Sequence, residues 1–167
     1  MNTELAIQFL ENHQPMPSDE DLSEKLIQTY DEVRRHFLKV PDKRCISLFL
    51  NSFGNIDGFG VYQLVEDVIL QFQKEDVIPI LIKTLKSDYY SVRYWCAMIS
   101  ANYPSLELLS TLKNLLYEDD FDIKAASLTS LSMYKFEETV EILKKYIEYE
   151  SDEELNADAK NILLTFK

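Results

Sequence analysis

The chain has 167 residues, and its 46% hydrophobic content with only three glycines and five prolines is typical of a folded, helix-rich protein. Its formal net charge of −12 would repel phosphate backbones, which disfavours nucleic-acid binding. Because no apolar run approaches 18 residues, we expect no membrane span, and the length predicts a single domain over 1–167.

The first 40 residues predict an N-terminal helical cap. Apolar residues at helical spacing indicate a helix over 3–13, which the prolines on either side of Met16 end. Ser18, followed by three acidic residues, is the predicted N-cap of a second helix that runs to about Leu38. This N-terminal stretch lacks a basic segment followed by an apolar run, so we do not expect a signal peptide.

Residues 41–167 predict helices joined by short polar turns, and no period-two alternation indicates a strand. All three glycines lie within 54–60, where they suit left-handed or tightly turned backbone. Lys-Ser or Lys-Thr does not follow them, so a phosphate-binding loop has weak support. The predicted helices cover 41–53, 61–73, 76–86, 89–102, 105–117, 121–134, 136–149 and 152–166.

An internal repeat with a period of 31 residues organises these helices into pairs. One apolar position of the first helix recurs in register, and so does an acidic position in the turn between the two helices. Each pair has an apolar face that it cannot bury alone, so neighbouring pairs must stack into a continuous core. The recurring positions are Leu50, Leu81, Leu112 and Leu143 for the helix, and Asp57, Asp88, Asp119 and Glu150 for the turn.

The best-matched unit has Pro79 in its first helix, Asp88 in its turn, and Val92-Arg93 with Ala97 in its second helix. This pattern resembles the HEAT repeat over about 41–167, although the first and last units lack the basic residue. The resemblance implies an all-α fold, a right-handed α-solenoid of about four HEAT-like helix pairs with residues 1–40 as its cap. Lys124 stands where Arg93 stands one repeat earlier.

Catalytic and metal-binding residues do not form a recognisable constellation. His13 and His36 lack partners at ligand spacing, so we expect surface histidines and no metal or other cofactor. Cys45 and Cys96 fall in apolar helical patterns, which indicates buried free thiols in a reducing compartment, the cytoplasm.

Enzymatic activity is an alternative with little support. The adjacent acids Glu66 and Asp67 would need a pocket and a matched partner for acid–base chemistry, and neither is visible in the sequence. Some DNA-base glycosylases are built from HEAT-like repeats, but their basic DNA-binding face is at odds with a charge of −12. We therefore predict a protein without catalytic activity.

Tyrosine and arginine are the residue types that most often anchor protein interfaces, and ten tyrosines are present. Second helices of a stacked array tend to line one concave surface. Ordinary solvated tyrosines are the competing interpretation. The residues that we expect to project there and bind a partner protein are Tyr62, Glu66, Tyr90, Arg93, Tyr94 and Lys124.

In its size, acidity and HEAT-like pattern the chain also resembles small bacterial immunity-type proteins. The segment 58–67 looks similar to segments of such small stand-alone HEAT-like proteins. This resemblance implies neutralisation of a toxin, whose cationic groove an acidic and aromatic face would occlude. The partner would then be a basic protein, with no role for nucleic acid or membrane. A general scaffold or adaptor, with a peptide or helix in the groove, stays open as the other possibility.

Overall fold

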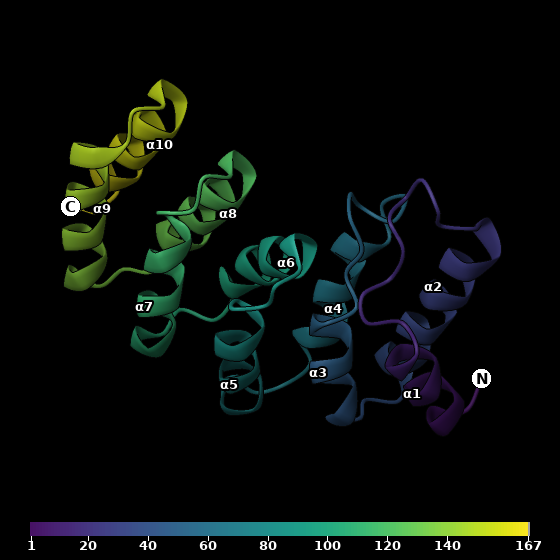
Figure 1. Cartoon of the computed structure of the whole chain (residues 1–167). Coiled ribbons are helices and arrows are strands. Elements are labelled where there is room, and N and C mark those ends of the chain that lie inside the picture. The colour runs from purple at the N-terminus through teal and green to yellow at the C-terminus, as the bar shows by residue number, and fades with distance from the viewer. Residues whose placement is uncertain (167) are drawn as a thin grey trace. The chain divides into compact units, whose positions relative to one another are not determined.

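The computed structural model describes residues 1–166, and every regular element in that range is a helix, which confirms the all-α prediction. The chain divides into two compact units, Met1–Cys96 and Ala97–Lys167. The first unit contains α1 (Thr3–Glu11), α2 (Glu24–Lys39), α3 (Arg44–Leu50), a 3-10 helix (Tyr62–Val65), α4 (Glu66–Ile69) and α5 (Lys74–Thr84). The boundary between the units falls within α6 (Tyr90–Ser100), and the second unit continues with α7 (Leu106–Leu115), α8 (Phe121–Ser132), α9 (Glu137–Tyr149) and α10 (Glu153–Leu164) (Figure 1).

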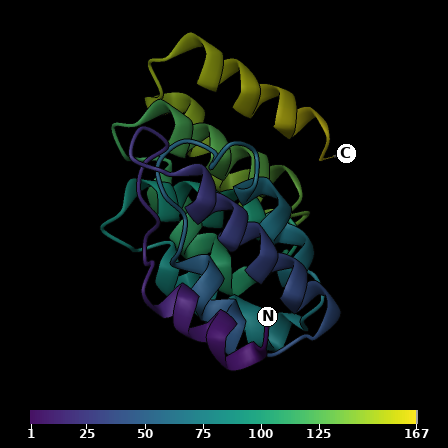
Figure 2. The ribbon, with the colours of Figure 1, turned by 90° about the vertical axis from the view of Figure 1, so that its right-hand side faces the viewer.

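The N-terminal helices differ from the prediction at the start of α2. Ser23, and not Ser18, caps this helix, because its side-chain oxygen accepts a hydrogen bond from the Leu26 N–H. Residues before Ser23 form turns that bury Leu22 and bring Asp19 to the segment around Gly58. Helix α1 packs against α2 and α3, and Figure 2 shows α1 beside α2 at the N-terminal end of the chain.

A cluster of aromatic rings forms the core of the first unit. Tyr30 of α2 lies edge-on to Phe49 and Tyr62, with ring centroids 5.8 and 5.6 Å away. Phe53 joins Tyr62 to Trp95 of α6, at 5.8 Å from each. The Phe53–Trp95 pair is stacked and the others are edge-to-face, and either arrangement adds about 0.5–1.5 kcal/mol per pair beyond area burial. The cluster therefore links four successive parts of the chain into one core.

The Tyr30 hydroxyl is satisfied inside this core. It lies 2.7 Å from the Ser52 hydroxyl, which donates its own proton to the Phe49 carbonyl 2.8 Å away. Because a serine hydroxyl has a single proton, Tyr30 is the donor in the first bond. Burial raises the pKa of Tyr30 above its ordinary value, so the hydroxyl stays protonated and able to donate.

The first helix pair is shorter and less regular than the sequence predicts. Helix α3 ends at Leu50 instead of continuing to Phe53, and its C-terminal Leu50 carbonyl accepts a hydrogen bond from the Cys96 thiol. The predicted helix over 61–73 is a 3-10 turn followed by the four-residue α4. Tyr62, in the 3-10 segment, is fully buried against rings from three other elements, and this packing sets the local path of the chain.

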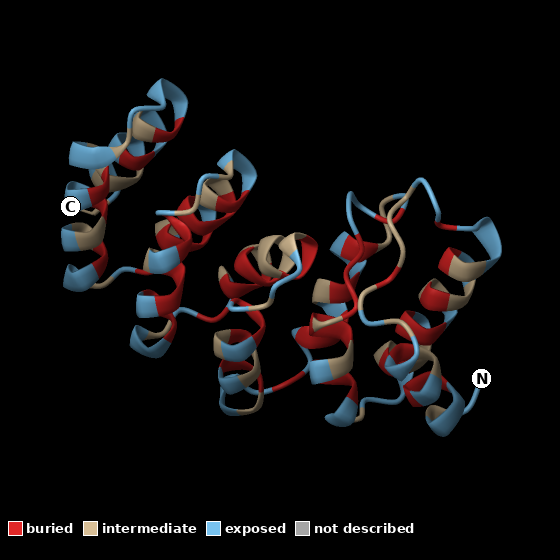
Figure 3. Cartoon of the chain, viewed as in Figure 1, coloured by how far each residue is buried: buried red, intermediate tan, exposed pale blue. Residues whose placement is uncertain are grey.

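The later helices agree with the predicted pairs to within a few residues at each end. Within the second unit α7 packs on α8, and α10 packs on both α8 and α9. Figure 3 shows the buried residues of these helices in red. Ser127 and Ser130 are also fully buried, and they donate to the carbonyls of Leu112 and Ala97, both at 2.7 Å. These bonds hold α8 close to its neighbours without bulky side chains between the backbones.

Gly54 lies where two segments of the first unit come close together. A methyl group at Gly54 would collide with the Pro17 carbonyl and lie 2.7 Å from the Met16 carbonyl. Met16 N–H also donates to the Ser52 carbonyl at 2.8 Å, which fixes this contact from the other side. We therefore predict that Gly54→Ala lowers the free energy of unfolding by about 1–3 kcal/mol, measured by urea denaturation.

The matched control is Gly60→Asn. Gly60 has a positive φ of 81°, a region that asparagine adopts more readily than other side-chain-bearing residues. A Cβ added at Gly60 would lie 3.5 Å from its nearest neighbour, the Gln63 side-chain amide. Because the left-handed position strains asparagine less than other residues, the control should lower the free energy of unfolding by at most about 1 kcal/mol, less than Gly54→Ala. If the two substitutions had equal effects, the close contact of Gly54 with Met16 and Pro17 would not be the reason that glycine is required there.

Candidate protein-binding surface

Three tyrosines lie in the first turns of α6 and in the residue just before it. The Tyr90 and Tyr94 rings, one helical turn apart, stack with 14° between their planes and 6.3 Å between centroids. Both are half-buried, while Tyr89 in the preceding turn is 54% exposed. We call these three residues the α6 tyrosines. Tyr94 also lies edge-on to Trp95 at 5.3 Å, which joins the α6 tyrosines to the aromatic core.

The turn before α6 holds these side chains in place. Tyr89 N–H donates to the Ser87 hydroxyl oxygen at 3.2 Å, and the Arg93 guanidinium donates to the Ser87 carbonyl at 2.7 Å. Ser91 donates to the Phe53 carbonyl at 2.7 Å from the buried side of the helix. Arg93 is half-buried, and its bond to Ser87 stabilises the turn. It lies between Tyr90 and Tyr94 in the sequence.

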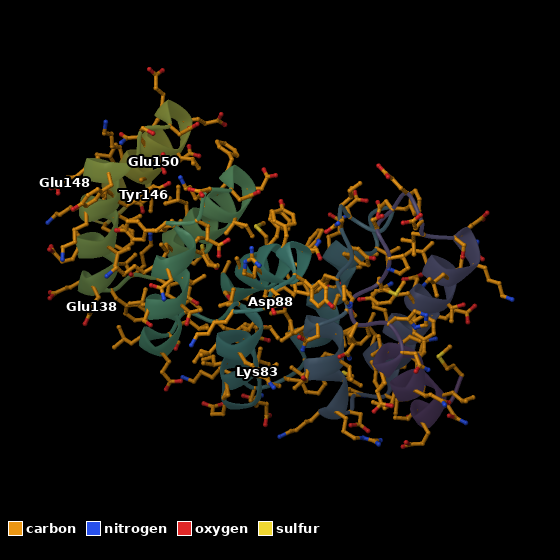
Figure 4. The ribbon with its side chains drawn as sticks, in the orientation of Figure 1. Lys83, Asp88, Glu138, Tyr146, Glu148 and Glu150 are labelled. Carbon is orange, nitrogen blue, oxygen red and sulfur yellow. The ribbon has the colours of Figure 1, made fainter. Side chains whose placement is uncertain are left out.

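A shallow groove of about 590 Å³ lies beside Tyr89, between α5 and the turn that follows it. Pro79 and Ile82 line its apolar side, and Lys83, Lys86 and Asp88 line its charged side. Figure 4 shows Lys83 and Asp88 in this region. The groove is open and mixed in charge, which suits surface contact with another molecule better than enclosure of a substrate.

Residues 54–60, which we call the glycine loop, border the same surface. The Trp95 indole N–H donates to the Ile56 carbonyl at 3.2 Å, so the loop is bonded directly to α6. Gly58 N–H donates to the Asp19 carboxylate at 3.0 Å, and Gly60 N–H donates to the Asp57 carboxylate at 3.1 Å. These bonds fix the loop between the N-terminal turns and α6.

Two of the six predicted contact residues, Tyr62 and Lys124, have roles inside the fold. The prediction that Tyr62 projects from the surface is wrong, because its side chain is fully buried in the aromatic core and its hydroxyl lies against Gly54. Burial raises the pKa of Tyr62 to about 12. Glu66 is half-buried at the start of α4. Tyr90, Arg93 and Tyr94 are brought together on α6, as expected from their spacing.

Lys124 of the second unit forms an internal ion pair. Its ammonium lies 2.8 Å from the Glu150 carboxylate, with side chains 18% and 5% exposed. The same carboxylate accepts hydrogen bonds from the Tyr146 hydroxyl at 2.6 Å and from the Asp152 N–H at 2.8 Å. Figure 4 shows Tyr146 and Glu150 together at the C-terminal end of α9. Lys124 thus ties α8 to the turn between α9 and α10.

A family model for HEAT repeats matches residues 71–163, which is more than half of the chain. The chain belongs to the HEAT-repeat family. HEAT repeats generally mediate protein interaction or scaffolding and are generally not enzymes. No curated protein matches the sequence. The match begins just before α5, so it covers the regular helix pairs and not the irregular first pair or the N-terminal helices.

The two cysteines of this HEAT-repeat chain are buried, and its two histidines contact neighbouring polar groups. Burial raises the pKa of both Cys45 and Cys96 to about 12, so these buried free thiols, as predicted, stay protonated. His13 contacts the Phe9 carbonyl at 2.7 Å and His36 the Thr3 hydroxyl at 3.0 Å. Among residues 1–166, His, Cys, Asp and Glu form no group of three or more that could hold a metal ion, and no helix is long and apolar enough to cross a membrane.

A second groove, of about 570 Å³, lies between α7 and α9 in the second unit. Leu106, Leu109 and Ile142 form its apolar part, and the exposed glutamates 137, 138 and 141 border it together with Lys113. Glu138 is labelled in Figure 4. Lys144 pairs with Glu141 on the outside of α9 at 3.2 Å, so part of this acidic border is already neutralised.

The sequence does not predict two features of the structure. The Glu150–Tyr146 hydrogen bond is one, because an acidic turn position does not specify which side chain it contacts. The exposure of Ile56 and Phe59 is the other, because glycines indicate a turn but not what the other side chains of the turn contact. Their signal is that two large apolar residues lie among the three glycines, in a segment outside the helical pattern.

The Glu150 cluster yields a pH-dependent prediction. Burial alone would raise the pKa of Glu150, but the bonds from Lys124, Tyr146 and Asp152 outweigh burial and lower it from 4.5 to about 2. Between about pH 2 and pH 4.5 the folded state therefore binds fewer protons than the unfolded state. The contribution of Glu150 to stability is complete above about pH 4.5. It is lost as the pH falls toward 2.

We expect Glu150→Gln to lower the free energy of unfolding at pH 7 by about 1–3 kcal/mol, because it leaves Lys124 partly buried without its counter-charge. The difference from the wild type should shrink as the pH falls from 4.5 to 2, measured by urea denaturation at each pH. The exposed neighbour Glu148, changed to Gln, is the control and should alter stability by less than about 0.5 kcal/mol. A difference that stays constant over this pH range would contradict the assignment.

Proposed function

We propose that this HEAT-repeat chain binds another protein, without catalysis, through a surface of the first unit centred on the α6 tyrosines. The observation that carries the proposal is the parallel stack of Tyr90 and Tyr94, half-exposed beside the exposed Tyr89. Tyrosines held rigid by stacking offer contact area at a low cost in side-chain entropy. Together with Arg93 and Glu66 they form the proposed contact set.

A basic partner is favoured by the charge of the chain. Residues 1–96 contain 10 basic and 15 acidic side chains, and residues 97–167 contain 7 and 14, which gives −5 and −7. Complementary charge accelerates association and rejects partners of the same sign. The salt dependence of binding should therefore be marked, because exposed charges are screened within about 8 Å at physiological ionic strength.

Within this class we favour a small immunity-type protein that acts in the cytoplasm, where its two buried thiols stay reduced. Its acidic and aromatic surface would occlude the cationic substrate groove of a toxin. This proposal includes the right-handed solenoid of about four helix pairs, in which second helices share a concave face. Size, charge and the HEAT-repeat family support it, and a scaffold protein with the same surface is the alternative.

The proposed surface is tested with Tyr90→Ala/Tyr94→Ala in affinity capture from the source cells at low and at high salt. We expect the wild type to capture a basic protein at low salt and to lose it at high salt. The double variant should capture at least about tenfold less, because truncation of interface tyrosines removes 1–2 kcal/mol or more of binding energy. Tyr149→Ala, which removes the 76% exposed tyrosine of α9, is the matched control.

Thermal unfolding of each variant separates loss of binding from loss of fold. Capture of no protein at either salt concentration, or equal capture by the double variant and Tyr149→Ala, would overturn the proposed surface. Co-expression with the captured partner then distinguishes the two roles. An immunity protein restores growth of cells that the partner alone inhibits, whereas a scaffold does not.

A further inference from the structure

The glycine loop presents two large apolar side chains to solvent on strained backbone. Ile56 and Phe59 are 62% and 64% exposed, and their φ angles are +68° and +52°. Residues with a Cβ rarely adopt this left-handed region, and a β-branched residue such as isoleucine does so least of all. Gly58 and Gly60 also have positive φ, so the loop turns sharply at almost every position.

The fold itself gains little from these two side chains. Glycine or asparagine would adopt the same backbone with less strain, and side chains as exposed as these add little buried area. Strained positions cluster at binding sites because the surrounding structure holds them in a conformation that function requires. Ile56 and Phe59 therefore have a chemical character that is useful only in contact with another molecule.

The loop is held in this conformation before any partner arrives. Asp19 and Trp95 bond it from both sides, through Gly58 N–H and the Ile56 carbonyl. Inside the loop the Asp57 carbonyl accepts from Gly60 N–H and Tyr62 N–H at 3.1 and 3.2 Å. A loop fixed in this way loses little conformational entropy on binding, which raises its affinity for a pocket of matching shape.

The charge around the loop identifies the kind of partner. Residues 18–22 and 54–60, the turn bonded to the glycine loop and the loop itself, contain four acidic residues and no basic residue. Asp57 and Glu20 are exposed, and Asp19 is half-buried beside Gly58. The two apolar tips thus lie close to a group of carboxylates in the sequence and in the hydrogen bonds of the loop.

We infer that the glycine loop inserts Ile56 and Phe59 into an apolar pocket of a partner protein whose rim carries lysine or arginine side chains. This inference rests on the proposed function, because Trp95 bonds the loop and packs against Tyr94, which connects the loop to the α6 tyrosines. It adds the apolar anchor and the position of the complementary charge. A second copy of the chain and an anionic lipid surface are disfavoured, since both would bring negative charge to these carboxylates.

The contact is tested by photo-crosslinking in the source cells. Phe59 is replaced by p-benzoylphenylalanine, and Met133, which is 55% exposed at the end of α8, receives the same replacement as a control. We expect a product at position 59 that is absent at 133, joined to an apolar segment with Lys or Arg nearby in sequence. A product with lipid, with another copy of this chain or with an acidic segment overturns the inference, and so does no product above the control.

A double substitution measures the energetic role of the loop in binding to the crosslinked partner. Ile56→Asn/Phe59→Asn keeps the charge and relieves backbone strain, so its melting temperature should equal or exceed that of the wild type. Its dissociation constant should rise at least tenfold, while Met133→Asn leaves it unchanged. An unchanged constant in the loop variant, with binding still lost in Tyr90→Ala/Tyr94→Ala, would overturn the loop insertion and leave the proposed function in place. If neither variant weakens binding, both proposals fail.

Discussion

The aromatic core of the first unit is the interaction on which its surface depends. Tyr30, Tyr62, Phe53 and Trp95 contact one another in sequence, from α2 to α6. Trp95 at the end of this series is half-buried, so it belongs both to the core and to the surface. Its indole bonds the glycine loop and its ring packs against Tyr94. Any change in the core packing would therefore be transmitted to both parts of the proposed interface.

Charge has two different uses in the two units. In the second unit Glu150 is almost fully buried and stabilises the turn between α9 and α10 through Lys124 and Tyr146. Near the glycine loop, by contrast, Asp57 and Glu20 face solvent. The first arrangement stabilises the fold, whereas the second places negative charge on the surface that we propose as the interface. The net charge of the chain alone does not distinguish these cases.

The sequence predicts the helices best where the pattern of apolar residues is longest. Helices α5 to α10 lie close to their predicted ranges, and the HEAT-repeat family confirms the resemblance. The N-terminal half departs from the pattern because tertiary contacts override it. Leu22 turns into the core and moves the cap of α2 to Ser23, and Tyr62 packs among rings instead of projecting from a helix.

Partner-contact residues are harder to predict. Helical periodicity shows which residues share a face of a helix, but not what each side chain contacts. Tyr90 and Tyr94 were identified from spacing, and they do share a face of α6. Lys124 has the same repeat position as Arg93, yet each bonds a different group, a carboxylate in one case and a turn carbonyl in the other. The left-handed backbone of Ile56 and Phe59 leaves no trace in residue types, since both residues normally avoid it.

The buried serines of α8 have a consequence for how relatives of this chain can diverge. A hydrophobic position of a repeat can exchange among leucine, isoleucine and valine with small adjustments of packing. Ser127 and Ser130 cannot, because each fills the narrow space between two helix backbones and bonds a carbonyl there. Relatives that preserve this helix spacing should accept only alanine, glycine or another small hydroxyl residue at these positions. Two small residues three positions apart would then report the spacing of these helices more directly than the leucines that define the repeat.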